Sequence, residues 1–272
     1  MKPLPQFSEE PSRSEPGTRA KGMPLLQFFK EFIEPEKEEL RKAPVFEFFA
    51  DQSLDTRLRF SFAPIVTPWA FGFGDINKFI LRDEGSKDPI QKIINTHTEE
   101  DDSHWKWFLH DLKELGMDDP NDFGSLVKFL WSDHCAQPRM TVYGLIGLIA
   151  PASPKMRMVI VEAIEAAGNV GFTALSQLSR EFQRDTGRTL LFFGDTHLGH
   201  ESGHAMGTEN VEDELAKIIL SDEEVEQAKP AVKKVFQLIR DIGDAYIKYA
   251  KAHPRLLKDL PAKPKPGERQ AK

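Results

Sequence analysis

The chain has 272 residues, of which 40% are hydrophobic and 29% charged, with a formal net charge of −7, one cysteine and eight histidines. A single cysteine cannot form an intrachain disulfide, and a net negative charge argues against general nucleic-acid binding, which needs a basic surface. The polar, proline-rich start does not resemble a signal peptide, and the longest apolar stretch, residues 142–150, is far shorter than a membrane span. We therefore expect a cytoplasmic globular protein whose partner is a small-molecule substrate, with no nucleic-acid and no membrane partner. A homodimer is its candidate assembly.

Composition divides the chain into three parts. Residues 1–21 are rich in Pro, Ser, Glu and Gly and offer nothing to bury, so we expect a disordered N-terminal segment. Residues 22–252 form the predicted body, a single helical domain without an internal linker. Residues 253–272 have the composition of a disordered basic tail.

Apolar residues recur every three or four positions through most of the body, which predicts helices. In chain order the expected helices cover residues 35–50, 54–82 (interrupted around Pro64 and Pro68), 88–115, a segment beginning at Asp119-Pro120, 140–150, 153–186, and a last one that follows Ser221. No segment shows the sustained alternation of a strand. The predicted fold class is all-α, a multi-helix bundle of about seven to nine helices with no sheet.

Capping residues mark the ends of the two longest predicted helices. Ser153-Pro154 combines an N-cap with proline at the first helical position, and Gly187 is placed to end that helix. Ser221 is followed by three acidic residues, the pattern of an N-cap with acids in the first turn.

Five of the eight histidines fall in two short windows that share one spacing pattern. His97, Asp101 and His104 form one His-x3-acid-x2-His pattern, with Glu100 at its margin. The second pattern is formed by three further residues, which are His197, Glu201 and His204. On a helix these positions share one face, and one such pattern is expected only about 0.04 times by chance in this composition.

Imidazole and carboxylate groups converging on one helical face indicate a metal site, and mixed nitrogen and oxygen ligands suit iron or manganese. Helix-bundle dimetal proteins take acid-x-x-His from each of two helices and a carboxylate from others. Glu162 and Glu165 lie in an otherwise apolar run and are the candidates for that third helix. An acid on an apolar face is costly to bury unless it is paired or binds a metal.

Other interpretations remain open. His200, Glu201 and His204 make a literal H-E-x-x-H, the zinc motif of metallopeptidases, in which the glutamate is the general base. The acids beside His97 would also suit a solvated helix face. A separate alternative is that the bundle is a non-catalytic iron-binding or interaction module. Cys135 beside His134 suggests a thiol nucleophile, but adjacent helical residues point apart. No converging partners are expected for the remaining histidines, which are His110, His134 and His253.

Two segments resemble the haem-oxygenase-like diiron oxidases and oxygenases. One runs from Ile94 through His97, Asp101 and His104 to Leu112, and the other from Leu191 to His204. The resemblance covers most of residues 45–250. In that family the second window lies about thirty residues after a helix that carries one glutamate ligand. In this chain that spacing favours Glu165 over Glu162 as the ligand.

The resemblance implies a haem-oxygenase-like helical bundle that binds two Fe(II) ions per chain and uses O2 as cosubstrate. The implied metal ligands are His97, His104, Glu165, His197, Glu201 and His204. The family usually has glutamate where His97 stands, so Glu100 and Asp101 remain alternatives for completing the first iron site. Glu162, Asp102, Asp195 and His200 are candidates for further ligands or for groups that orient the imidazoles, as is Asn95. No catalytic residue beyond the ligands is expected.

The activity that the resemblance implies is that of a non-haem diiron oxidoreductase that oxidises a small substrate. The expected substrate is an amino-acid-derived compound or a small carboxylate, oxidised by N-oxygenation or oxidative C–C cleavage, and a biosynthetic pathway is the expected setting. Arg82, Arg139 and Arg157 are candidates for binding a carboxylate. Aromatic walls are expected from among Trp69, Phe71, Phe73, Trp105, Phe108, Phe192 and Phe193.

Overall fold

The computed structural model describes residues 22–203 and 211–262, and within them the predicted all-α class is confirmed. Of the α-helices in these ranges, eight have eight or more residues, in agreement with the expected number. The expectation of no sheet needs one correction. The two-residue strands β1 (Met23–Pro24) and β2 (Ile219–Leu220) pair antiparallel, with Met23 opposite Leu220.

The N-terminal third is more broken than predicted. Its elements are α1 (Leu25–Phe28), the π-helical turn η1 (Phe29–Ile33), α2 (Glu34–Leu40), α3 (Pro44–Ala50), α4 (Thr56–Arg59), α5 (Ala63–Asp75) and the π-helical turn η2 (Ile76–Leu81). The helix predicted over 35–50 is interrupted before Pro44, which starts a new helix at its first position. Pro64 stands in the first turn of α5, where its missing N–H costs nothing, and Pro68 lies inside that helix.

The single helix predicted over 88–115 is two helices, α6 (Pro89–Asp101) and α7 (Trp105–Glu114). The Arg82 guanidinium explains where α6 ends. It donates to the backbone oxygen of Thr98 at 2.8 Å, which also accepts from the N–H of Asp102, and to Oδ2 of Asp102 at 2.9 Å. A tertiary contact therefore holds the residues at which the helix ends.

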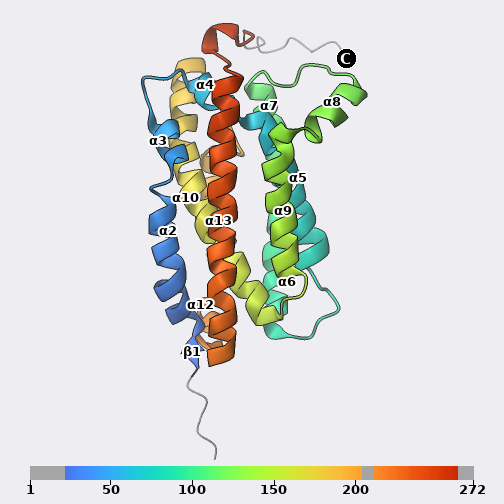
Figure 1. Ribbon diagram of the computed structural model, residues 1–272, viewed down its shortest axis with the longest axis vertical. Helices are drawn as coiled ribbons and strands as arrows, with labels where there is room; N and C mark the ends of the chain where they lie inside the picture. Colours follow the sequence, from blue (N-terminus) through green and yellow to red (C-terminus); the bar gives the residue numbers. More distant parts are fainter. Residues whose placement is uncertain (1–21, 204–210, 263–272) are drawn as a thin grey trace, which may run out of the picture.

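The next elements are α8 (Phe123–Leu130), the 3-10 turn η3 (Asp133–Cys135) and α9 (Ala136–Ile149). The helix expected from Asp119-Pro120 begins later, because Asp122 is the N-cap of α8 and accepts from the backbone of Ser125. No residue of α8 is buried, and Figure 1 shows this helix projecting from the side of the bundle.

The two long helices were predicted closely. They are α10 (Pro154–Thr186), capped by Ser153 and ended by Gly187 at φ 67°, and α13 (Asp222–Ala252), which starts with a complete capping box at Ser221. Between them lie α11 (Asp195–Gly203) and α12 (Val211–Ala216).

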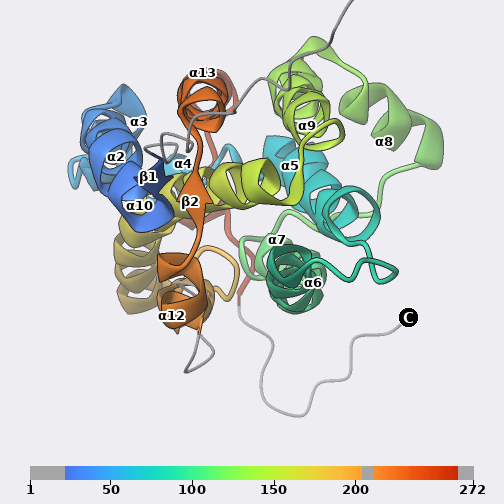
Figure 2. The same cartoon turned by 90° about the horizontal axis from the view of Figure 1, so that it is seen from below.

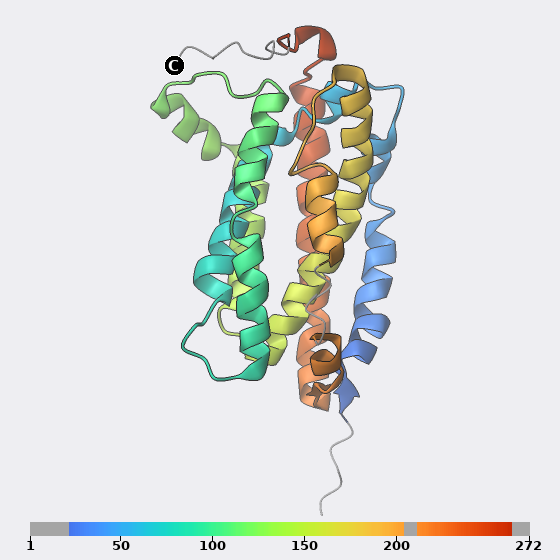
Figure 3. The same ribbon diagram turned by 180° about the vertical axis from the view of Figure 1, so that it is seen from behind.

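The long helices run along one axis (Figure 1). Seen from below, α10 lies between α2 and α3 on one side and the α5, α6 and α7 group on the other (Figure 2). From behind, α6 and α7 form one broken column, and α11 lies beside α10 (Figure 3). Two clusters of buried apolar residues fill the interior, one including Ile164 of α10 and the other including Phe62 and Leu175.

Residues 253–262, which the sequence analysis assigned to a disordered tail, are held against the body. Leu257–Asp259 form the 3-10 turn η4, and Leu257 packs on the second apolar cluster. The buried Arg57 guanidinium donates to the backbone oxygens of Leu115, Gly116 and Leu256, which ties this segment to the end of α7. The other tail assignments, residues 1–21 and 263–272, lie outside the described residues.

The helix α10 is long and apolar enough, by length and composition, to cross a membrane, although half of its most apolar window is buried inside the fold. The core helix of a globular protein passes the same test. Helix α10 also carries Glu162 and Glu165 in this apolar stretch. The expected cytoplasmic location stays a prediction.

Candidate metal centre

The last two turns of α6 bring His97 and Asp101 together. These residues are four positions apart, so their side chains lie one above the other on the same helix face. The Nε2 atom of His97 is 3.2 Å from Oδ2 of Asp101. Each residue is only 6% exposed, so both groups are withdrawn from bulk water.

Glu165 joins this pair from α10. Its Oε1 atom lies 3.4 Å from Nε2 of His97, and the ligand atoms of His97, Asp101 and Glu165 are all within 4.8 Å of one another. Glu162 does not belong to this group. Burial, reinforced by the charge of Glu165, raises the pKa of Glu162 to about 7. Of the two candidates on α10, Glu165 is therefore the one placed to share a metal ion with the α6 residues.

His104 also lies beside Asp101, but it is not on the helix from which its position was predicted. It lies beyond the end of α6, as the N-cap residue of α7, so the helical spacing assumed for it does not apply. Its Nε2 atom is nevertheless 3.8 Å from Oδ1 of Asp101, and its ring stacks on Trp107. Asp101 thus directs one carboxylate oxygen toward His97 and the other toward His104.

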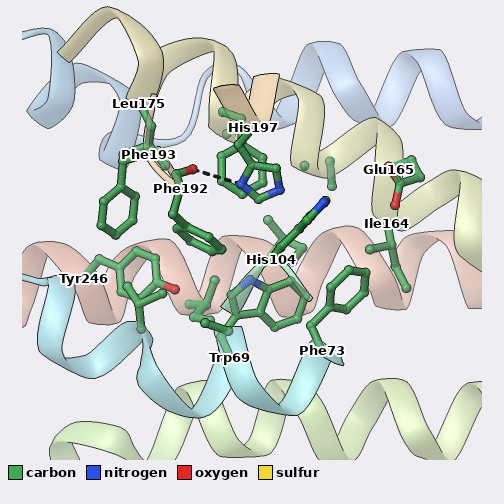
Figure 4. Close-up of a pocket in the computed structure, with 18 of the residues that line it drawn as sticks. Trp69, Phe73, His104, Ile164, Glu165, Leu175, Phe192, Phe193, His197 and Tyr246 are labelled. Carbon is green, nitrogen blue, oxygen red and sulfur yellow. Dashed lines mark hydrogen bonds between the residues drawn. The ribbon is translucent and has the colours of Figure 1, made fainter. Parts of the chain in front are cut away.

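His197 in α11 completes the described part of the site. Its ring is 4.7 Å from the ring of His104, centre to centre, and it is 4% exposed. Its Nδ1 atom lies 2.9 Å from the backbone oxygen of Phe192 (Figure 4). A carbonyl oxygen only accepts, so Nδ1 carries the proton and Nε2 holds the free electron pair that a metal would need. Burial, and then the charge of His104, lowers the pKa of His197 to about 3.

The loop before α11 is fixed by Asp111, a residue that the sequence analysis did not select. This fully buried carboxylate accepts from the backbone N–H of Leu191 at 2.7 Å and of Phe193 at 2.9 Å. The same loop requires Gly194, because a Cβ atom there would lie 2.0 Å from the backbone oxygen of Leu190. Nothing in the local sequence marks Asp111, since its partners are backbone groups eighty residues away.

The acids around His97 give the cluster a strong preference for a cation. Burial acts to lower the pKa of His97, but the Glu165 carboxylate at close range and the charges of Asp101 and Glu162 outweigh it and raise that pKa to about 9. Burial, with the charge of Glu165, raises the pKa of Asp101 to about 7. In the absence of a metal ion, His97 and Asp101 therefore bind protons more readily than usual. A bound metal ion would supply the same positive charge.

The residues present fit a metal ion. The Nε2 atom of His97 is buried and makes no well-aligned hydrogen bond, although two carboxylates are close to it. A buried polar atom without a partner is costly, and a metal ion between the three groups would satisfy it. Neutral imidazole with carboxylate oxygen is a donor set that iron and manganese accept.

The other sequence candidates lie away from this cluster or outside the described side chains. Glu100 is exposed. Asp102 is paired with Arg82, and Asp195 is paired with Arg180 at the surface. Asn95 joins the α6 start to the preceding loop through Asp83. The side chain of Glu201 and the whole of His204 are not among the described residues, so the ligands expected from them stay predictions.

Of the three motif residues in the H-E-x-x-H segment, only His200 has a described side chain. It is exposed and packs near Trp107, whereas His197 of the same helix is buried and is not part of that motif. The peptidase interpretation stays an alternative. Cys135 is buried as well, and burial raises its pKa to about 11, so its thiol stays protonated at neutral pH.

The histidines expected to lack partners need a correction. His110 Nδ1 is 3.0 Å from Oδ1 of Asp111, so this histidine helps to hold the carboxylate that fixes the loop before α11. The rings of His134 and His253 lie 4.9 Å apart, and Tyr249 stacks on His253. The second pair therefore packs with Tyr249 and is not part of the acidic cluster.

A cavity of about 120 Å³ lies beside the cluster, where the two apolar clusters of the interior meet. Asp101, His104, Glu165 and His197 contribute its polar wall (Figure 4). Of the aromatic residues expected around a pocket, the following line it: Trp69, Phe73, Phe192 and Phe193. Phe71 and Trp105 stack on each other outside this cavity, and Phe108 packs in the core.

Comparison with protein-family models and with curated proteins found no match for this chain. Functional inference therefore depends on the four residues that meet at the cavity and on their chemistry.

Proposed function

We propose that the protein is a non-haem metal-dependent oxidoreductase that uses O2 to oxidise a small substrate held in the cavity beside His104 and His197. The observation that carries this proposal is the position of Asp101. One of its oxygens faces His97, at 3.2 Å from Nε2, and the other faces His104, at 3.8 Å. A carboxylate placed between two imidazoles is suited to bridging two metal ions.

His97, Asp101 and Glu165 would hold one ion, and His104 and His197 would contribute to the second, with Asp101 shared. Iron in such a site supplies binding of O2 and transfer of electrons to it. Two irons per chain remain the proposed complement, because the resemblance assigns further ligands to Glu201 and His204.

The chain's own groups prepare this chemistry. The hydrogen bond from Nδ1 to the Phe192 carbonyl fixes the ring of His197 and keeps Nε2 unprotonated. His97 must release its proton from Nε2 when a metal binds, because a protonated imidazole is not a ligand. Trp69, Phe73 and Phe192 line the cavity beside the ligands, so a substrate would meet a mostly apolar surface there.

The proposal is tested by loading the purified protein with Fe(II) without oxygen and then measuring bound iron and O2 consumption. We expect close to two irons per chain and O2 uptake that depends on the iron. The variant His97→Ala should lose both, whereas His253→Ala, on an exposed side chain, should keep both. Iron binding without O2 uptake would favour an iron-binding module, and one zinc per chain with peptide cleavage would favour the peptidase.

A further inference from the structure

The lining of the cavity restricts what kind of molecule can lie next to the proposed metal centre. No lysine or arginine is among the described residues that line it. Apart from the cluster, the lining includes one polar side chain with a hydroxyl, that of Tyr246, whose ring stacks on Phe62 at 4.7 Å. Burial raises the pKa of Tyr246, so this hydroxyl is neutral at physiological pH.

The arginines expected to bind a substrate carboxylate are engaged elsewhere. Arg82 binds Thr98 and Asp102 at the end of α6. Arg139 donates to backbone oxygens at the end of α8, and Arg157 donates to Gln91 on α6. None of the three lines the cavity, so these side chains would not bind a carboxylate inside it.

The shape of the cavity follows from the residues of α10. Gly171 stands on the wall of the cavity, and a Cβ atom there would meet nothing within 4 Å. Trp69, whose ring stacks on Phe73 at 5.2 Å, also lines the cavity (Figure 4). Glycine and alanine residues together with aromatic rings therefore leave an apolar space. A designed apolar cavity of about 150 Å³ accepts benzene, so this one matches a single ring or a short chain.

We infer that the substrate of the proposed oxidation enters as an uncharged apolar group, one aromatic ring or a short alkyl chain, which lies in the cavity against Trp69 and Gly171. The inference rests on the proposed function for the role of this ligand as substrate. It replaces the expectation of a small carboxylate bound by arginine. Displacing poorly ordered water from an apolar cavity favours binding of such a group without any ionic contact.

Binding of toluene to the metal-free protein tests this inference separately from the oxidation. We expect saturable binding at one site by calorimetry and no binding of glutamate or lysine at the same concentrations. The variant Gly171→Leu fills the space and should weaken toluene binding at least tenfold. Gly147→Leu is the matched control, because Gly147 lies in the surface face of α9 and its Cβ would also meet nothing within 4 Å.

A second variant keeps the test decisive if Gly171→Leu does not fold. Trp69→Ala enlarges the cavity and should shift the preference from toluene toward naphthalene. Toluene binding that Gly171→Leu and Trp69→Ala leave unchanged, or binding of charged amino acids in place of toluene, would overturn the inference. Toluene binding in a protein that takes up no iron would instead reject the proposed oxidation and leave the apolar site standing.

Discussion

Nε2 of His97 on α6 lies 3.4 Å from Oε1 of Glu165 on α10, so the two helices meet through an imidazole and a carboxylate in the interior of the bundle. In the metal-free protein this contact stabilises the protonated imidazole and raises the pKa of His97 to about 9. The same contact would bind a metal ion once the proton has left. The stability of the metal-free protein is therefore linked to pH at this residue.

Stability of the metal-free protein should fall as the pH rises from 6.5 to 9. The pKa of His97 is about 9 in the folded state and ordinarily 6.5, so its contribution is fully present below pH 6.5 and is lost as the pH passes 9. At about 1.4 kcal/mol per pKa unit the loss is at most about 3.5 kcal/mol. Urea unfolding of the wild type and of His97→Gln across this range measures it.

The variant His97→Gln cannot titrate, so its free energy of unfolding should be flatter than that of the wild type above pH 6.5. His253→Gln is the control on an exposed side chain and should follow the wild type. Asp101 and Glu162, whose pKa values are raised to about 7, add a loss of stability at lower pH, as the pH rises from about 4 to 7. A wild-type slope above pH 6.5 that persists in His97→Gln would contradict the assignment.

Metal binding should depend on Glu165 and not on Glu162, although the two acids are one turn apart on α10. A metal that binds only the folded state stabilises it by about 2.7 kcal/mol at a hundredfold excess over its dissociation constant. Glu165→Gln keeps the shape but removes the charge beside His97, so we expect most of this stabilisation to be lost. Thermal unfolding with and without Fe(II) or Zn²⁺ measures it, with Glu162→Gln as the matched control. If both variants lost the same amount of metal-induced stabilisation, α10 would contribute only negative charge near the metal and no specific ligand.

The parts of the fold that could be predicted are those set by local signals. Ser153 and Ser221 have cap side chains that bond backbone groups three residues away, so the starts of α10 and α13 follow from the sequence. His97 and Asp101 could be paired for the same reason, because α6 is helical through both residues.

Contacts across the fold explain what the sequence could not predict. The end of α6 depends on Arg82, which comes from the loop after η2, so the position of His104 could not be derived from helical spacing. Asp111 binds backbone N–H groups of residues 191 and 193, and backbone groups leave no mark on the sequence. The apolar character of the cavity likewise depends on which faces of α5 and α10 turn toward each other.

Asp111 should matter for the site although it does not touch the metal-binding group. Asp111→Asn replaces one accepting oxygen by a donor that faces a backbone N–H, and an unsatisfied buried donor costs about 1–3 kcal/mol. We expect loss of stability by about that amount and weaker iron binding through a displaced His197. Asp195→Asn is the comparison, because its pair with Arg180 is exposed and contributes at most about 1 kcal/mol. The free energy of unfolding and the iron affinity are measured for both variants. Equal changes in Asp111→Asn and Asp195→Asn would contradict the role given to Asp111.

Gly194 and Gly199 form a second matched pair around α11. Gly194→Ala places a Cβ atom against the backbone oxygen of Leu190 and should cost about 1–3 kcal/mol, as overpacking does. Gly199→Ala meets nothing within 4 Å in the helix and should be neutral or stabilise by up to about 1 kcal/mol. Opposite signs in urea unfolding are expected. A neutral Gly194→Ala would mean that the loop can move away from Leu190, and the position of His197 would then not be fixed by it.

His197 should stay neutral from pH 5 to 8, with its proton on Nδ1, because its pKa is lowered to about 3 and Nδ1 donates to the Phe192 carbonyl. Nitrogen-15 NMR of the labelled metal-free protein should show an unprotonated Nε2 whose shift is constant over this range. His197 can then accept a metal without giving up a proton, whereas His97 must lose one. Calorimetry of Zn²⁺ binding at pH 7.5 in two buffers should accordingly show proton release that His97→Gln reduces. A His197 resonance that titrates between pH 5 and 8 would contradict the tautomer, and proton release unchanged in His97→Gln would contradict the difference between the two histidines.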